Sequence, residues 1–239
     1  LRWWRTVALV CTAWVVGCAG PHAESRARAD SLVQAWIEDG RIPGAVLSIA
    51  HGSEPTWEKA YGLAHAFEFG SGQYPSAAAA TGETSASGIQ PLATPRSMTS
   101  ATVFDLASVT KVMATTMAVM VLVDEGRLDL DSPVSVHLAD FAEGERAGIT
   151  PRHLLTHTSG LPQWLPVYYH AASAAEAHRY VGSVPLQWPV GAERHYSDLG
   201  FMVLGRLVER VSGLALDRFV HERLYEPLGL TSTGFQEHL

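Results

Sequence analysis

The chain has 239 residues, of which 47% are hydrophobic and 17% are charged, and this composition is that of a folded globular protein rather than a disordered one. The length allows one domain with a sizeable core or two small domains. A formal net charge of -7 argues against nucleic acid as a partner.

The first twenty residues have the features of an export signal. Arg2 and Arg5 give a basic start, and the apolar run over 7–16 is too short to span a bilayer but suits a signal-peptide core. The run ends in a small residue and Cys18, an ending that resembles a bacterial lipobox. We therefore expect residues 1–18 to be a signal peptide and Cys18 to carry a lipid. The alternative is a plain secretory signal with an incidental cysteine.

A lipid on Cys18 would tether the chain to a membrane without a spanning helix. The expected location is then the bacterial cell envelope, as an exported lipoprotein that is periplasmic or associated with the outer membrane.

The segment 24–63 is predicted to form a helix followed by a β-hairpin. Apolar residues such as Leu32 and Trp36 follow helical spacing between residues 24 and 39. Residues 45–50 have the pattern of a buried strand, and residues 56–61 have that of its partner.

Residues 64–100 differ from both neighbouring regions because they are rich in Ala, Ser, Gly, Thr and Pro. Such a composition offers little to a core, so we predict a flexible surface insertion. A functional lid is the alternative.

The segment 101–239 begins with a predicted helix over 105–125 that is apolar on nearly all sides. A helix of this kind is expected to lie buried in the middle of a protein. Lys111 and Asp124 argue against a membrane span.

Ser108 and Lys111 lie three residues apart at the start of this helix, in an S-x-x-K pattern. On a helix they share one face, which brings a hydroxyl and an amine within reach of each other. A serine hydroxyl needs a neighbouring base to become a good nucleophile, and a lysine can be that base only if burial lowers its pKa. The pattern alone is weak and occurs by chance in many proteins.

The second half of the chain is predicted to be almost wholly helical, with helices near 150–157, 199–211 and 214–225. His153 and His157 have the i, i+4 spacing of some zinc sites, but no third ligand follows in the pattern, and we predict no metal site.

Three stretches together carry a resemblance. They are Ser108-Val109-Thr110-Lys111, His157-Thr158-Ser159-Gly160-Leu161 and Tyr196-Ser197-Asp198. Their order and spacing resemble the serine β-lactamase and penicillin-binding-protein superfamily, in particular the class C β-lactamase branch with its esterase and D-peptidase relatives. The resemblance runs from about residue 32 to residue 235, without the insertion.

The resemblance implies a β-lactamase-like (DD-peptidase) fold of the α/β (α+β) class, with the active site between the sheet and the helical region. It implies a serine hydrolase that forms an acyl-enzyme on Ser108. Lys111 would take the serine proton, Tyr196 would relay protons, and the backbone N–H of Ser108 would be one oxyanion donor. No cofactor is expected.

The substrate implied by the resemblance is a small molecule or a peptidoglycan-type compound: a β-lactam, a D-Ala peptide or a carboxylic ester. The runner-up is a non-catalytic or singly acylated protein that binds penicillin or peptidoglycan. An inactive fragment is a further alternative.

Asp198 is a departure from the family pattern, in which asparagine is usual. An ionised aspartate accepts hydrogen bonds but cannot donate them. An anion near Lys111 would raise the lysine pKa and would repel substrate carboxylates. We therefore expect esters or uncharged amides to be favoured over β-lactams.

The family's third motif, Lys-Thr-Gly or His-x-Gly, has no equivalent, since the only lysines are Lys59 and Lys111. We expect a C-terminally truncated record, in which the C-terminal sheet strands are missing and turnover is small.

Four more residues are predicted to shape the site. His157 is expected to hold a loop in place through hydrogen bonds, and Gly160 lies in the turn that follows. Gln163 and Trp164 are expected to line the substrate cleft, although Trp164 fits the core equally well.

Overall fold

The structure is a computed structural model that describes residues 22–53, 55–69 and 89–235. The predicted signal peptide, the cysteine expected to carry a lipid (Cys18) and the middle of the expected insertion lie outside these residues. The chain divides into two compact units, Leu1–Val103 and Phe104–Leu239, and each is described by itself.

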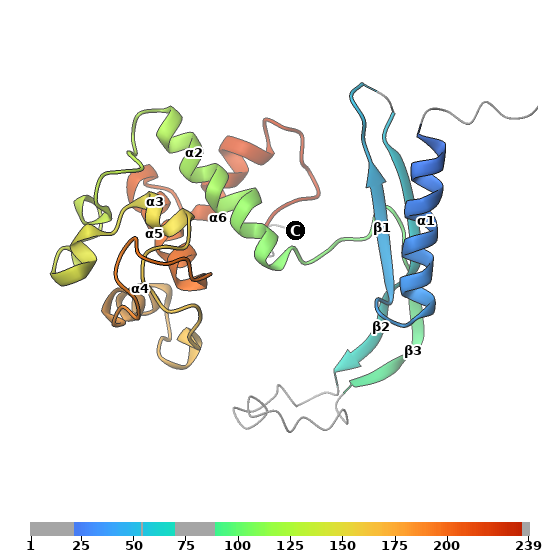
Figure 1. Cartoon of the computed structure of the whole chain (residues 1–239), viewed down its shortest axis with the longest axis horizontal. Coiled ribbons are helices and arrows are strands. Elements are labelled where there is room, and N and C mark those ends of the chain that lie inside the picture. Colours follow the sequence, from blue (N-terminus) through green and yellow to red (C-terminus); the bar gives the residue numbers. More distant parts are fainter. Residues whose placement is uncertain (1–21, 54, 70–88, 236–239) are drawn as a thin grey trace, which may run out of the picture. The chain divides into compact units, whose positions relative to one another are not determined.

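The first unit joins one helix to a three-stranded antiparallel sheet of order β1-β2-β3 (Figure 1). Gly44 pairs with Gly62 and Ile49 pairs with Trp57, so β1 and β2 form the predicted hairpin. The elements are α1 (Ala23–Glu38), β1 (Gly44–Ile49), β2 (Trp57–Phe69) and β3 (Ile89–Ser97).

A polar contact ties α1 to the sheet. The Tyr61 hydroxyl donates a 2.7 Å hydrogen bond to Asp30 Oδ1, and the Lys59 ammonium group contacts the same oxygen. Desolvation and the neighbouring carboxylate raise the pKa of Tyr61 to about 12. Of the apolar residues at helical spacing in α1, Leu32 and Trp36 are 54% and 43% exposed, and no residue of α1 is fully buried, so α1 contributes little apolar burial.

The prediction of a flexible insertion over the whole of 64–100 is wrong at both ends. Residues up to Phe69 continue β2, and Ile89–Ser97 form β3, which pairs with β2. Pro91 and Pro95 are tolerated because β3 is an edge strand, where a missing backbone donor need not break a ladder. Composition concealed these strands because backbone hydrogen bonds form almost regardless of side chain.

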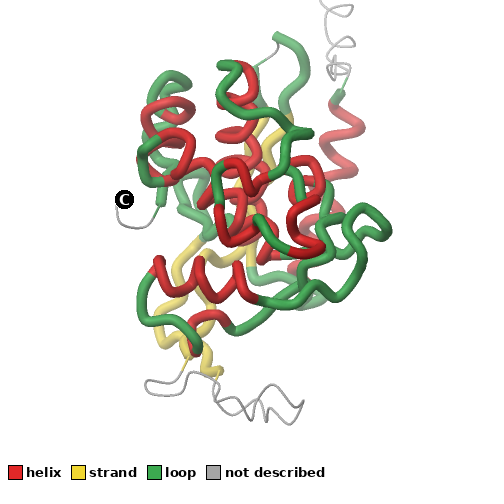
Figure 2. Tube along the Cα trace, turned by 90° about the vertical axis from the view of Figure 1, so that its left-hand side faces the viewer, coloured by secondary structure: helices red, strands yellow, loops and turns green. Residues whose placement is uncertain are grey.

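The second unit is helical, and Figure 2 shows its helices in red, joined by long loops. Two elements, η3 and η8, are π-helical, and the other η elements are 3₁₀ turns. The elements are η2 (Ala107–Val109), η3 (Lys111–Thr116), α2 (Met117–Asp124), η4 (Val134–Val136), η5 (Ala139–Phe141), η6 (Gly144–Gly148), α3 (Pro151–Leu155), η7 (Val167–Tyr169), α4 (Ala174–Ser183), α5 (Asp198–Ser212), α6 (Leu216–Val220) and η8 (His221–Tyr225).

Helix α5 organises this unit, because it packs against α2, α3, α4 and α6. Its first turn is capped by the Ser197 hydroxyl, which accepts a 3.0 Å hydrogen bond from the Gly200 N–H. Gly213 ends it in the left-handed conformation, with φ of 80°. Leu204 and Leu207 of α5 are fully buried, and the large buried side chains elsewhere in the unit include Phe141, Phe219, Leu122, Ile149 and Leu154.

The segment 107–124 differs from the regular, fully buried helix that the sequence predicts. It passes from a 3₁₀ turn through a π-helical turn into α2. Ala118 and Leu122 are fully buried, whereas Val112 and Met120 are 59% and 56% exposed. Within the unit, α5, α6 and η8 cover only one of its faces, which explains the exposed apolar side.

Among the described residues, the helix Ala107–Asp124 is long and apolar enough to cross a membrane by length and composition alone. The helix also contacts other parts of its unit, since α2 packs against α5, α6 and η8.

Candidate active site

The nucleophile candidate, Ser108, follows a residue with unusual backbone geometry. Ala107 has φ of 43°, in the left-handed region that side-chain-bearing residues seldom adopt. Asp105 Oδ1 accepts a 2.8 Å hydrogen bond from the Ala107 N–H and so supports this conformation. Strain of this kind costs about 1–3 kcal/mol and gathers at functional sites. Ser108 itself is exposed.

Lys111 connects the nucleophile to an acidic residue. Its ammonium group donates a 3.2 Å hydrogen bond to Ser108 Oγ and lies 2.6 Å from Asp198 Oδ1. The Lys111 side chain is only 15% exposed, while that of Asp198 is 40% exposed. Asp198 Oδ1 is buried and makes no hydrogen bond of good geometry to any described residue, so the ionic contact with Lys111 compensates its charge.

The pKa of Lys111 is raised above its ordinary value. Burial is the largest single influence and lowers it, but the Asp198 carboxylate and the Tyr196 hydroxyl together outweigh burial. The expectation that an anion near Lys111 would raise the lysine pKa is therefore confirmed. A raised pKa favours the charged form of the amine, and the ammonium group donates to Ser108 Oγ.

Tyr196 faces the same amine. The Lys111 ammonium group lies 5.0 Å from the centre of the Tyr196 ring. Hydrogen bonding to Ser108, and then to Lys111, lowers the pKa of the Tyr196 hydroxyl. A phenol with a lowered pKa beside a serine hydroxyl and a cation is suited to accept a proton.

His157 joins its own stretch, residues 157–161, to the stretch that contains Tyr196, residues 196–198. Its Nδ1 accepts a 3.0 Å hydrogen bond from the Ser197 N–H, and its carbonyl oxygen accepts one of 2.8 Å from the His195 N–H. Its ring packs against Tyr196, with centroids 4.5 Å apart, and against Phe201. Burial lowers the His157 pKa and keeps the ring neutral, which the hydrogen bond to Nδ1 requires.

His153 stabilises the start of α3. Its Nδ1 contacts the Thr150 backbone in a capping box at the start of α3. The described residues contain no group of three His, Cys, Asp or Glu side chains able to hold a metal ion.

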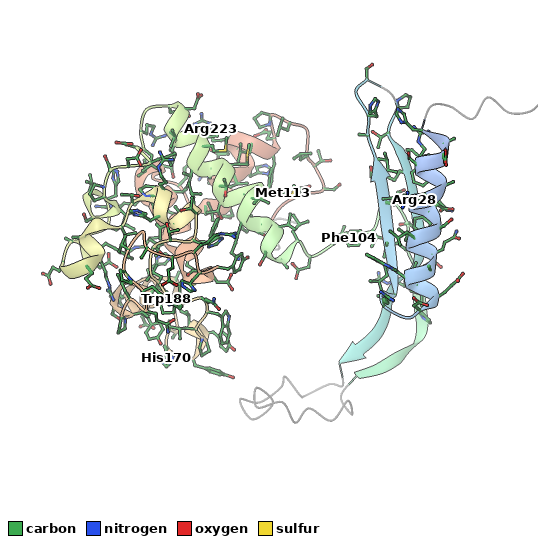
Figure 3. All side chains as sticks on the ribbon, in the orientation of Figure 1. Arg28, Phe104, Met113, His170, Trp188 and Arg223 are labelled. Carbon is green, nitrogen blue, oxygen red and sulfur yellow. The ribbon has the colours of Figure 1, made fainter. Side chains whose placement is uncertain are left out.

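Gly160 lies where a side chain would not fit. Its φ is 78°, and a Cβ there would come within 2.1 Å of the Trp188 carbonyl oxygen. The Gly160 carbonyl oxygen accepts a 2.8 Å hydrogen bond from the Gln187 N–H. Trp188, labelled in Figure 3, in turn stacks on His195 with ring centroids 3.6 Å apart. This close packing fixes the loop that leads to Tyr196.

Gln163 and Trp164 follow this loop. The Gln163 carbonyl oxygen accepts a 2.8 Å hydrogen bond from the Asp198 N–H, so its backbone positions Asp198. Trp164 is 57% exposed, which excludes a core position, and it lines a cavity together with Asp198.

Two residues near the site were not predicted as site residues. Ser197 is buried, caps α5 and donates a 2.7 Å hydrogen bond to the Pro162 carbonyl oxygen. Its place before a helix is a recognisable capping signal. The Phe201 ring lies 5.8 Å from the Lys111 ammonium group. Only its helical periodicity was visible in the sequence, and that indicates burial and nothing more.

The second unit thus brings Ser108, Lys111, Tyr196, His157 and Asp198 into one constellation. A hydroxyl, a cation and a phenol with a lowered pKa lie in mutual contact. This arrangement can activate a hydroxyl for attack on an acyl carbon.

Comparison with known proteins gives a consistent picture. A sequence profile described as Beta-lactamase matches residues 29–238. An N-acetylmuramyl-L-alanine amidase of Bacillus subtilis is 31% identical over 219 residues, which cover 86% of this chain and 45% of the amidase. The esterase EstB of Burkholderia gladioli is 33% identical over 232 residues, which cover 89% of this chain and 52% of the esterase.

Among solved structures, a class C beta-lactamase matches with a TM-score of 0.69 at 18% identity, over 93% of this chain and 55% of that one. At this identity the match concerns the fold. The chain spans about half the length of the curated relatives it matches.

Proposed function

Because the chain belongs to the beta-lactamase family, we propose that it is a serine hydrolase that acts on esters or amides through an acyl-enzyme on Ser108. One observation carries this proposal. Lys111 contacts both Ser108 and Asp198, at 3.2 Å and 2.6 Å, beside a tyrosine whose pKa is lowered by Ser108 and Lys111.

In the proposed acylation step, Tyr196 reacts as the phenolate, which its lowered pKa favours. Ser108 Oγ forms a bond to the substrate carbonyl carbon as the serine proton passes to the phenolate oxygen of Tyr196. Tyr196 then gives that proton to the leaving group as the carbon–leaving-group bond breaks. Lys111 stays a cation and stabilises the developing charge on Ser108 and Tyr196. This assignment replaces the initial expectation that Lys111 accepts the proton, because its raised pKa makes it a poor neutral base.

The proposed substrates are esters or uncharged amides. The Asp198 carboxylate lies beside the amine that contacts the nucleophile, so a substrate carboxylate there would meet a like charge. The names of two relatives, an amidase and an esterase, agree with this class of bond. β-Lactams and D-Ala peptides both carry a carboxylate and are expected to react more slowly.

We also propose that the chain is an exported lipoprotein of the cell envelope, anchored through Cys18. The basic start, apolar core and cysteine at its end support this. Metabolic labelling with a palmitate analogue tests it: incorporation that is lost in Cys18→Ser supports the anchor, and equal incorporation in both proteins contradicts it.

Hydrolysis of p-nitrophenyl acetate tests the enzymatic proposal. We expect at least one equivalent of p-nitrophenolate to be released by the parent chain, and a release indistinguishable from buffer by Ser108→Ala. Equal release from both proteins would overturn the proposal. Stoichiometric labelling by a fluorescent penicillin, without any ester reaction, would instead favour a penicillin-binding or peptidoglycan-binding role.

A further inference from the structure

The backbone that leads into Ser108 has a conformation that is rare among the described residues. Phe104, labelled in Figure 3, begins the second unit, and the segment after it leads to Ser108. Leu106 has φ of -74°, in the right-handed helical region, whereas Ala107 has φ of 43°. Of the described residues other than glycine, only Ala107 and His157 have a positive φ. Strain at such a position persists only where the surrounding structure supports it.

The Asp105 side chain supplies this support. Its Oδ1 accepts a 2.8 Å hydrogen bond from the Ala107 N–H, two residues further along the chain, which is the pattern of an Asx turn. Within the described ranges, Asp105 is exposed, forms no ion pair and makes no other side-chain hydrogen bond. The contact with Ala107 is therefore the interaction that this carboxylate makes in the described part of the chain.

Both backbone polar groups of Ala107 are hydrogen-bonded, because its carbonyl oxygen accepts from the Thr110 N–H in the turn η2. The peptide group that joins Ala107 to Ser108 is thereby held in one orientation. Ser108 Oγ in turn accepts a 3.2 Å hydrogen bond from Lys111 and is hydrogen-bonded to the Tyr196 hydroxyl. Relaxation of Ala107 to the right-handed region would rotate this peptide and displace Ser108 from both partners.

We propose that Asp105 is a positioning residue for the nucleophile. Its carboxylate oxygen holds Ala107 in the left-handed conformation, and this conformation places the Oγ and the backbone N–H of Ser108 for reaction with a substrate carbonyl group. The inference rests on the proposed serine hydrolase function. Asp105 does not touch the reacting atoms, and the route of the serine proton to Tyr196 is unchanged.

Two substitutions separate the hydrogen-bond acceptor of Asp105 from its charge. The rate of fluorophosphonate labelling of Ser108 is the measurement. Asp105→Ala removes the acceptor and should slow labelling by about tenfold to a hundredfold, the loss expected when a nucleophile is misplaced by ~1 Å. Asp105→Asn removes the charge but keeps a side-chain oxygen that can accept from the Ala107 N–H, so labelling should stay close to the parent rate.

A second substitution, at Ala107, tests the backbone directly. Glycine adopts a positive φ without steric cost, so Ala107→Gly added to Asp105→Ala should recover most of the lost labelling rate. Ala107→Val in the parent chain should slow labelling, because a β-branched residue is seldom found in the left-handed region. A change in folded-state stability alone would not be reversed by introducing a glycine.

Asp129 provides a matched control in the loop after α2. Its Oδ1 accepts a 3.0 Å hydrogen bond from the Asp131 N–H, which is the same type of turn in a different loop. Asp129→Ala should therefore leave the labelling rate of Ser108 unchanged. All rates are measured well below the melting temperature of each variant, so that loss of folded protein does not enter the comparison.

The pH dependence of labelling adds a second readout. Asp105 makes no printed contact with Lys111 or Tyr196, so Asp105→Ala should lower the rate at every pH without moving the midpoint of the profile. A shifted midpoint would mean that Asp105 acts through its charge, and the positioning assignment would be wrong.

The outcomes distinguish the two proposals. If Asp105→Ala labels at the parent rate, or if Ala107→Gly does not restore its rate, the positioning assignment is wrong and the hydrolase proposal stands. Equal slowing in Asp105→Asn and Asp105→Ala would also overturn it, because the acceptor would then not be the cause. If Ser108 of the parent chain does not react, both proposals are wrong.

Discussion

The Lys111 ammonium group lies 2.6 Å from the Asp198 carboxylate, and this ion pair determines how the amine can serve Ser108. The carboxylate raises the pKa of the amine, and for this reason we propose Tyr196 as the proton acceptor.

Asp198→Asn should shift the pH dependence of Ser108 reactivity toward lower pH. The Asp198 charge raises the pKa of Lys111 and also opposes the lowering of the Tyr196 pKa, so its removal lowers both. The measurement is the rate of fluorophosphonate labelling from about pH 5 to about pH 10. Asp198→Glu keeps the charge and is the control; an unchanged profile in Asp198→Asn would contradict the account.

The same substitution should change substrate preference. Without the carboxylate, a carboxylate-bearing β-lactam meets less repulsion, so the ratio of nitrocefin to p-nitrophenyl ester reaction rates should rise by about tenfold, or ~1.4 kcal/mol. Rates of both reactions are compared in the parent and Asp198→Asn. If the ratio does not rise, Asp198 does not discriminate against anionic substrates.

Tyr196→Phe should slow Ser108 labelling by about 10²–10⁴-fold, the usual contribution of a general base. The ring contact with His157 is retained, so the melting temperature should stay close to that of the parent. Lys111→Met serves as a comparison, because it removes the cation and leaves the phenol. A Tyr196→Phe variant that labels at the parent rate would return the role of base to Lys111.

His157 should make the parent chain sensitive to acid. Burial lowers the His157 pKa in the folded state below its ordinary value of 6.5. As the pH falls below 6.5, the unfolded chain therefore binds more protons than the folded chain, and the free energy of unfolding decreases. The decrease ends once the pH is below the lowered pKa of the folded state. His157→Asn keeps a side-chain acceptor and tolerates the φ of 60°. Melting temperatures of both proteins across this window are compared.

His178, whose pKa is also lowered by burial, is present in both proteins, so the difference between them reports His157 alone. Parallel melting curves for the parent and His157→Asn on acidification would contradict a buried, neutral His157.

Gly160→Ala should destabilise the chain far more than Gly213→Ala. Both glycines have positive φ, of 78° and 80°, so both substitutions carry about 1 kcal/mol of backbone strain. Only at Gly160 would the new Cβ meet the Trp188 carbonyl oxygen, at 2.1 Å, and a loss of more than ~3 kcal/mol is expected. Denaturant unfolding of the two variants gives the comparison, and equal losses would argue against the close contact.

Much of the fold was predictable from sequence because the signals are local. Strand β1, α5 and the start of β2 follow from apolar periodicity and turn residues, and they appear within a few residues of their predicted bounds. Strand β2 extends past its predicted end at residue 61 to Phe69. The strands at the ends of the expected insertion were missed because their composition is that of a loop, while their stability comes from pairing with distant residues.

Those site residues that lie in short sequence motifs could be predicted from the sequence. Ser108, Lys111 and Tyr196 were named from three short patterns, and the structure brings them together. The strained Ala107 and the exposed face around Val112 have no local sequence signal, because they depend on how the unit packs. The raised pKa of Lys111 depends on Asp198, a residue 87 positions away in sequence, and only the structure gives the separation of the two side chains.

Peptide mapping by mass spectrometry, after reaction of the chain with a fluorophosphonate, tests directly whether Ser108 is the nucleophile. One phosphonyl adduct is expected, on Ser108, which is absent from Ser108→Ala and forms slowly in Tyr196→Phe. An adduct on a different serine, or equal labelling of Ser108→Ala, would contradict this assignment.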